Sequence, residues 1–293
     1  MDRKRRQKFR KRRKKRRDQT RAQRGGRLPD CSFGFAAEKM MLELDQTDKS
    51  DPEYRAQMLY FAAMESGDPA RVLKLLDEAL GLDPDCVDAL RITVEIGCES
   101  RDDLVEGMQN TVQIAEEKLG KEAFEDDRGH FWGVVRTRPY MRARSRLAKL
   151  LCESGRFDEA AGHFLELLEL DPHDHIGSRY RLLEIYLQQS KIDDAHELLS
   201  AYEDDPAATW QWGWILTVFL LGDEQGAADL LALAREDNPF VENYFTGRRQ
   251  IPDHPSDSIR FGGEDEAQTT AFEIGAAWKA HPRAVQWLRQ QTH

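Results

Sequence analysis

The chain has 293 residues, of which 40% are apolar and 33% charged, and its formal net charge is −10 at pH 7. This length suits one large or two ordinary domains with a real core. No stretch approaches the roughly 18 consecutive apolar residues of a transmembrane helix, so no membrane span is predicted. The four cysteines include no CxxC pair and predict reduced, mostly buried thiols in a cytosol-like compartment.

The charge is divided unevenly along the chain. Residues 1–27 hold 16 of the 43 Lys and Arg residues but only two of the 53 acidic residues, so they carry +14 and the remainder carries −24. Like charges at this density repel, and no apolar residues recur at helical spacing, so residues 1–30 are predicted to be a disordered basic tail. No apolar stretch follows to complete a secretory signal, and the run lacks the amphipathic, Ser-rich character of a mitochondrial presequence.

The basic tail indicates a polyanion-binding or nuclear-localisation arm, because clustered Lys and Arg release counterions when they meet phosphates. Two other interpretations stay open, since the tail could be solubilising decoration or an autoinhibitory lid folded back on the acidic body. We expect a cytoplasmic protein, or a nuclear one in a eukaryote. The candidate polyanion-binding residues are Arg5, Arg6, Arg10, Lys11, Arg12, Arg13, Lys14, Lys15, Arg16 and Arg17.

From about residue 35 onward the chain shows amphipathic runs of Ala, Leu, Glu and Arg, broken by Gly and by Asp-Pro or Asn-Pro pairs. Strand alternation is almost absent, so an all-α fold with at least ten helices is predicted. Steps of 32, 88, 34 and 33 residues separate the prolines of these pairs, which are Pro52, Pro84, Pro172, Pro206 and Pro239. Steps near 34 are typical of an array of helix-turn-helix repeats.

Alignment on these prolines defines the repeat units 53–84, 141–174, 176–206 and 208–239. In the second of them, Ala148 and Ala160 stand where two antiparallel helices must approach closely. Gly155 is expected to end the first helix, and Pro172 to stop the second. Residues 86–140 are predicted to hold an irregular unit, with helices near 86–98 and 102–118 followed by an insertion.

The phrase GRFDEAAGHFLELLELDP at 155–172 resembles the tetratricopeptide repeat, and the resemblance covers most of residues 53–239. It implies that residues 31–293 form a right-handed helical solenoid, with a concave groove lined by first helices and a capping region at 240–293. The phrases GHFWGVVRTRPYMRAR, DPHDHIGSRYRLL, NPFVENYFTGR and EDEAQTTAFEIGAAWKAHPRAVQWL resemble a narrower bacterial group. The last two are also similar to the C-terminal part of the suppressor-of-tumorigenicity-7 proteins. Neither resemblance implies a defined reaction.

In a tetratricopeptide unit, helical periodicity places one stripe of the first helix on the groove. The groove residues predicted to bind a partner are Arg142, Arg146, Lys149, Tyr180, Arg181 and Trp212. Such a surface suits a peptide that carries a carboxylate and apolar anchors. The alternative for the three arginines is that they only balance the acids of neighbouring turns. Of the alternating tryptophans at 210, 212 and 214, Trp212 is the expected groove member.

The sequence contains no G-x-S-x-G phrase and no phosphate-cradling glycine loop, so no catalytic residue and no cofactor is predicted. The alternative function is a metal-dependent enzyme or enzyme subunit that uses the His and Asp cluster near 171–175. This cluster contains Asp171, His173, Asp174 and His175, with His163, Asp194 and His196 nearby. No HExxH spacing frames it, and acidic turns before helices are typical of caps, so no metal is expected.

The favoured function is therefore a non-catalytic tetratricopeptide scaffold. Its groove is expected to bind a protein or peptide partner, and its tail is expected to tether the complex to nucleic acid, the ribosome or another polyanion.

Overall fold

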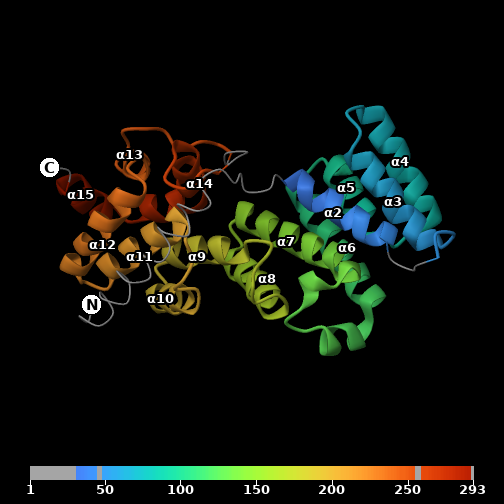
Figure 1. Ribbon diagram of the computed structural model, residues 1–293, viewed down its shortest axis with the longest axis horizontal. Helices are drawn as coiled ribbons and strands as arrows, with labels where there is room; N and C mark the ends of the chain where they lie inside the picture. Colours follow the sequence, from blue (N-terminus) through green and yellow to red (C-terminus); the bar gives the residue numbers. More distant parts are fainter. Residues whose placement is uncertain (1–30, 45–47, 255–258, 292–293) are drawn as a thin grey trace. The chain divides into compact units, whose positions relative to one another are not determined.

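The computed structural model describes residues 31–44, 48–254 and 259–291, which form fourteen α-helices, two short 3₁₀ helices and no strand (Figure 1). The prediction of an all-α fold with at least ten helices is confirmed. The predicted basic tail, with all its candidate binding residues, lies outside the described residues. In the part of the chain that the structure describes, no helix is both long and apolar enough to cross a membrane.

The described chain divides into two compact units, residues 31–179 and residues 180–293. The helices of the first unit are α2 (Cys31–Leu44), α3 (Pro52–Met64), α4 (Pro69–Leu82), α5 (Val87–Gly97), α6 (Arg101–Asp126), α7 (Arg138–Glu153) and α8 (Phe157–Leu170). Helix α9 (Ser178–Gln188) begins at the boundary between the units. It is followed by α10 (Ile192–Ala201), α11 (Ala208–Leu220), α12 (Glu224–Asp237), α13 (Val241–Phe245), α14 (Glu264–Ala280) and α15 (Pro282–Gln290).

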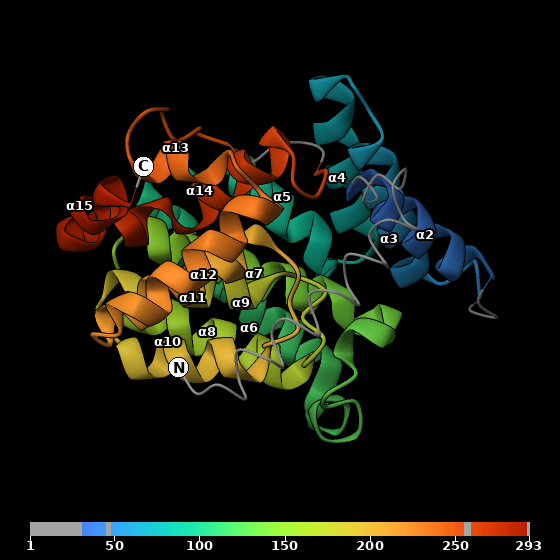
Figure 2. The same ribbon diagram turned by 60° about the vertical axis from the view of Figure 1, so that its left-hand side comes forward.

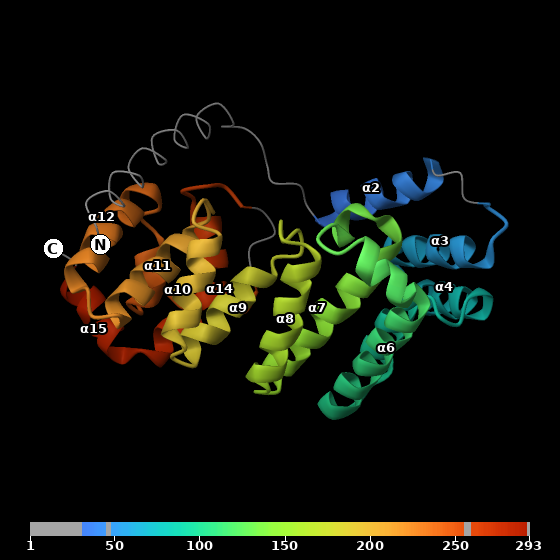
Figure 3. The same cartoon turned by 90° about the horizontal axis from the view of Figure 1, so that it is seen from below.

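Within the first unit the helices pack as sequential pairs, α3 with α4 and α7 with α8 (Figure 3), and α5 with α6. The α7–α8 pair forms where the sequence places it: Ala148 and Ala160 are fully buried. Gly155 has φ +73°, a left-handed conformation that glycine adopts without a steric penalty, and the amide of Arg156 donates to the Leu151 carbonyl over 2.8 Å. The predicted break between these two helices is therefore confirmed.

The irregular unit departs from the predicted lengths. Helix α6 continues to Asp126, beyond the predicted end near residue 118, with a non-helical break at Gly120, where φ is +71°. The insertion that follows holds two 3₁₀ helices, η1 (Phe131–Gly133) and η2 (Val135–Thr137). The buried Phe131 ring packs 5.1 Å from Phe124 and 6.0 Å from Tyr140, measured between ring centroids. This aromatic cluster anchors the insertion to the first turn of α7.

In the second unit α11 pairs with α12, and both α14 and α15 pack against α11 (Figure 2). The segment 240–293, which the resemblance implies is a capping region, contains α13, α14 and α15. Helix α11 also approaches α9 closely, because a Cβ atom on Gly213 would lie 2.7 Å from Cδ2 of Leu183. In α13, which precedes α14, Tyr244 and Phe245 are buried.

Candidate partner-binding face

The candidate site lies in the first unit, where α3, α5 and α7 turn polar side chains toward one another and toward α2. Residues three or four apart share one side of a helix, so each helix contributes two side chains. Gln57 donates to Asp88 over 3.0 Å, and Arg91 donates to the Tyr60 hydroxyl over 3.3 Å, which joins α5 to α3. We name this surface the inner face; it consists of Gln57, Tyr60, Asp88, Arg91, Arg142 and Arg146.

Arg142 is the centre of the inner face. Its Nη1 donates to Oε2 of Glu38 on α2 over 2.8 Å, and its Nη2 donates to Oε1 of the same carboxylate over 3.0 Å. Its Nε donates to Oδ1 of Asp88 over 2.9 Å, and Nη2 also contacts Oδ2 of Asp88. The planar guanidinium suits this double fork, which a lysine could not reproduce.

These ionic groups are taken out of water. Glu38 is 3% exposed and Asp88 is 0% exposed, while the Arg142 side chain is 14% exposed. Burial by itself would raise the pKa of Asp88, but the charges of Arg142 and Arg91 and the hydrogen bonds outweigh it, so the pKa is lowered. Burial disfavours the charged Arg142, but Asp88 and Glu38 raise its pKa. Both partners are therefore charged throughout the ordinary pH range.

On the side of α7 that carries Arg142, the basic residues are less enclosed toward the C-terminal end of the helix. Arg138 is buried at the N-terminal end, where its Nε donates to the Trp132 carbonyl over 2.8 Å and Nη1 lies 3.5 Å from Glu38. Arg146 is 28% exposed and contacts Glu95 at 3.4 Å and Glu153 at 3.3 Å. Lys149 is exposed. The predicted residues Arg142, Arg146 and Lys149 thus run from a buried to an open position along one helix.

Tyr180 and Arg181, which the sequence predicts on the same groove, belong to the second unit. The Tyr180 hydroxyl donates to Asp205 over 2.8 Å. The Arg181 guanidinium lies 4.8 Å above the Phe272 ring centroid and contacts Glu184 at 3.2 Å. Burial raises the pKa of the Glu184 carboxyl to about 7, and the charge of Arg181 only partly opposes this effect.

The prediction that Trp212 lines an accessible groove is wrong. Its side chain is 0% exposed, with its ring 5.3 Å from Phe245 and 5.8 Å from Trp278. The physical reason is that α13 and α14, which come later in the chain, pack against this side of α11. The alternation in the sequence shows that Trp212 faces away from Trp210 and Trp214, but it does not show that a later segment buries that face too.

The His and Asp cluster near 171–175 forms a helix-capping turn in the first unit. Asp174 accepts from the amides of Ser178 over 2.7 Å and of Arg179 over 3.0 Å, so it caps α9 as the pattern indicates. The Asp171 carboxylate accepts a hydrogen bond from the backbone amide of His175 over 2.8 Å and another from Nδ1 of the His175 ring over 3.0 Å.

The remaining candidates for metal chemistry do not join this turn. His163 lies on α8, and burial together with the Arg144 charge lowers its pKa to about 4. His196 packs edge-on against Trp214, with the ring centroids 5.4 Å apart. Among the residues that the structure describes, no three His, Cys, Asp or Glu side chains are grouped closely enough to hold a metal ion.

Sequence reasoning missed four of the six inner-face residues, which are Gln57, Tyr60, Asp88 and Arg91. It also missed Glu38, which pairs with Arg142, and Arg138, which lies beside Glu38. Asp88 and Arg91 had a usable signal, since they lie three residues apart in a first helix and so share one stripe. Glu38 had none, because it belongs to a helix outside the repeat units, and only the tertiary structure brings it to Arg142.

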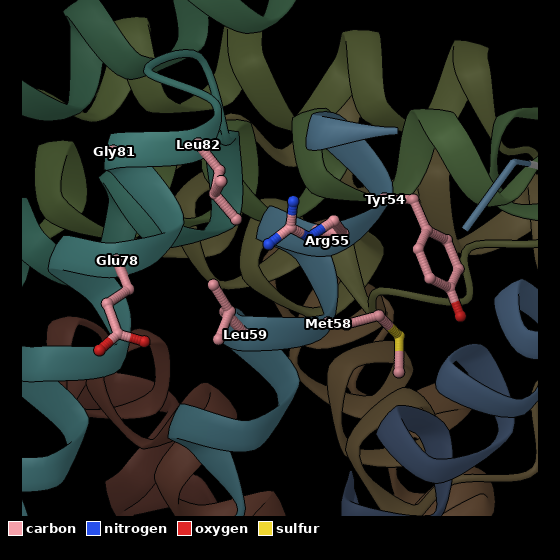
Figure 4. A pocket seen from close by; sticks show the side chains of 7 residues that line it. All are labelled: Tyr54, Arg55, Met58, Leu59, Glu78, Gly81 and Leu82. Carbon is pink, nitrogen blue, oxygen red and sulfur yellow. The ribbon is translucent and has the colours of Figure 1, made fainter. Parts of the chain in front are cut away.

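A shallow hollow of about 490 Å³ lies elsewhere in the first unit, between α3 and α4 (Figure 4). Its apolar lining includes Met58, Leu59 and Leu82, and its charged groups are Arg55 and Glu78, both exposed. A binding pocket for a small molecule normally adds convergent polar groups to such apolar walls. The hollow therefore defines a ligand chemistry less well than the inner face does.

Comparison with known proteins adds no identification, since no protein-family model matches the chain and no curated protein matches it significantly. The tetratricopeptide resemblance therefore stays a prediction.

Proposed function

We propose that the chain is a non-catalytic interaction scaffold, a tetratricopeptide-like solenoid that binds a protein or peptide partner on the inner face of its first helices. The observation that carries the proposal is the pair of hydrogen bonds that Arg142 donates to the Glu38 carboxylate. A helix from outside the repeat units packs against α3 and is joined to α7 by this ion pair, and its one well-buried ionic group is a carboxylate. This arrangement supports recognition of a carboxylate-bearing helix by the same surface.

The partner's charged groups would meet the more open end of α7. The Arg142 side chain is 14% exposed in its contacts with Glu38 and Asp88, whereas Arg146, which pairs with Glu95 and Glu153, is 28% exposed and Lys149 is exposed. These two residues follow Arg142 by one and two helical turns and therefore lie on the same side of the helix. A negatively charged segment of a partner would be attracted to this end in a salt-dependent way.

The basic tail supplies the second half of the proposed function. With +14 on residues 1–27 and −24 on the remainder, the tail is the segment suited to a phosphate polymer, and the body would be repelled by one. The tail would thus tether the scaffold and its partner to nucleic acid, the ribosome or another polyanion. We place this activity in the cytoplasm, where the cysteines are expected to be reduced. Burial raises the pKa of the Cys86 thiol to about 12, which suits an inert, reduced cysteine of the core.

The test is affinity capture with the immobilised full chain from the cytosol of the source cells. The variant carrying Arg146→Glu and Lys149→Glu should lose its protein partner, and deletion of residues 1–27 should remove polyanions while the partner is retained. Arg71→Glu together with Lys74→Glu is the matched control, because it makes the same charge change on exposed positions of α4. Equal capture by the α7 variant, the α4 variant and the unmodified chain would refute the inner face as the partner site.

A further inference from the structure

The side chains of α2 are described for residues 36–44. Among them Glu38 is the best buried, and it forms the fork with Arg142. Leu42, four residues later and therefore on the same side of the helix, is partly buried against the core cluster of α3 and α4. Lys39 forms an ion pair with Glu65 at 2.9 Å, and the Glu65 side chain is 60% exposed. Among these described residues, Glu38 and Leu42 therefore make the inward contacts with Arg142 and with the core cluster.

The side of α2 away from Glu38 carries apolar side chains that face solvent. Met40 and Leu44 are 59% and 71% exposed. Met41 stands next to Glu38 on the helix; it is 50% exposed, and its Sδ lies 3.9 Å from Nη2 of Arg138. A helix that belongs to a core turns its apolar stripe inward and its charges outward. Helix α2 instead turns a carboxylate inward and exposes its methionines, and large exposed apolar groups mark interaction sites. It thus sits on the first unit in the way that a bound peptide sits on a receptor.

We propose that α2 is an internal occupant of the inner face, and that the partner which replaces it is a helical peptide with a glutamate four residues before a leucine. This inference rests on the proposed scaffold function and names the class of partner. The glutamate would take the fork of Arg142, and the leucine would take the place of Leu42 against α3. The charge of the site favours this partner, because the Arg142 guanidinium keeps Asp88 as its second ligand when Glu38 leaves.

Because α2 occupies the inner face, an external helix must compete with α2 to bind there. Only residues 45–51 connect α2 to α3, so α2 competes at an effective concentration on the order of millimolar. The apparent affinity for an external helix is then reduced by the fraction of molecules in which the face is open. Weakening the attachment of α2 should therefore strengthen binding of an external peptide, and this inverse relation separates an occupant from an ordinary core helix.

The experiment uses the full chain and a fluorescein-labelled peptide with the sequence of residues 32–48, followed by fluorescence anisotropy. Glu38→Gln in the protein removes the charge-assisted fork and should tighten peptide binding about tenfold or more, which corresponds to the usual strength of such bonds. Adding Arg142→Gln to that variant should abolish the gain. A peptide in which glutamine replaces the glutamate at the position of Glu38 should bind the Glu38→Gln protein at least about tenfold more weakly than the original peptide.

A second route does not touch the ion pair. Leu42→Ala in the protein should also tighten peptide binding, and far-ultraviolet circular dichroism checks that each variant is folded. If peptide binding is the same in the unmodified chain and in both the Glu38→Gln and Leu42→Ala variants, α2 is a fixed structural helix and the inference is overturned. If the peptide fails while cellular capture still depends on Arg146 and Lys149, the scaffold proposal stands and only this inference falls.

Discussion

Removal of the Arg142 guanidinium would take the shared counter-ion from two buried carboxylates and leave Glu38 and Asp88 only their longer contacts with Arg138 and Arg91. Glu38 and Asp88 are 3% and 0% exposed, and three of the hydrogen bonds they accept from Arg142 are 2.8 to 3.0 Å long. Breaking a buried pair by deleting one partner costs about 3–5 kcal/mol, because the remaining charge is left uncompensated. We expect Arg142→Gln to lower the free energy of unfolding by this amount, which is a large fraction of the 5–15 kcal/mol typical of a domain.

The measurement is urea unfolding followed by circular dichroism at 222 nm. Arg128→Gln is the matched control, since Arg128 pairs with Glu169 over 2.9 Å but both side chains are more than half exposed, and its unfolding midpoint should barely move. The lowered pKa of Asp88 means that its stabilising contribution is present above the unfolded pKa of 3.8 and is lost as the pH falls through the folded value. The difference between the unmodified chain and Arg142→Gln should therefore shrink below about pH 4. A loss no larger than that of the control, or one that does not depend on pH, would refute the reasoning.

Three further predictions concern the tail and the second unit. Binding of the full chain to mixed-sequence nucleic acid should weaken with salt, with log-log slopes near −0.9 per neutralised phosphate on duplex DNA and about −0.7 on single strands. Deletion of residues 1–27 should abolish this binding in a salt titration, and equal binding by the truncated chain would contradict the polyanion anchor. Trp212→Ala should destabilise the fold by about 3–5 kcal/mol in urea unfolding, because it opens a cavity between α11, α13 and α14. An unchanged midpoint would show that this site does not pack as described. The raised pKa of Glu184, about 7 against an ordinary 4.5, makes the folded chain bind the proton more tightly than the unfolded chain. The Glu184 contribution to stability is therefore largest below about pH 4.5 and declines as the pH rises through about 7. Glu184→Gln should flatten this part of a melting-temperature profile between pH 4 and 8, and identical profiles would exclude the effect.

The helices of the repeat units could be predicted from the sequence because their signals are local. The Asp-Pro steps and Gly155 act on the backbone of a few neighbouring residues, so α7 and α8 form close to the predicted unit 141–174. Local signals also identified Asp174 as a cap, since the amides it accepts from are four and five residues away. The end of α6 was misplaced, because the helix resumes after Gly120.

The inner stripe of α7 was visible in the sequence as well, and Arg142, Arg146 and Lys149 share it through helical periodicity alone. Whether each residue faces solvent was decided only by tertiary structure. Glu38 lies 104 residues from Arg142 in the chain, and its approach encloses a charge that the pattern predicts to be open. Trp212 is enclosed in the same way by Phe245 and Trp278. Periodicity specifies the direction of a side chain relative to its own helix, whereas exposure depends on which distant segment packs against that direction.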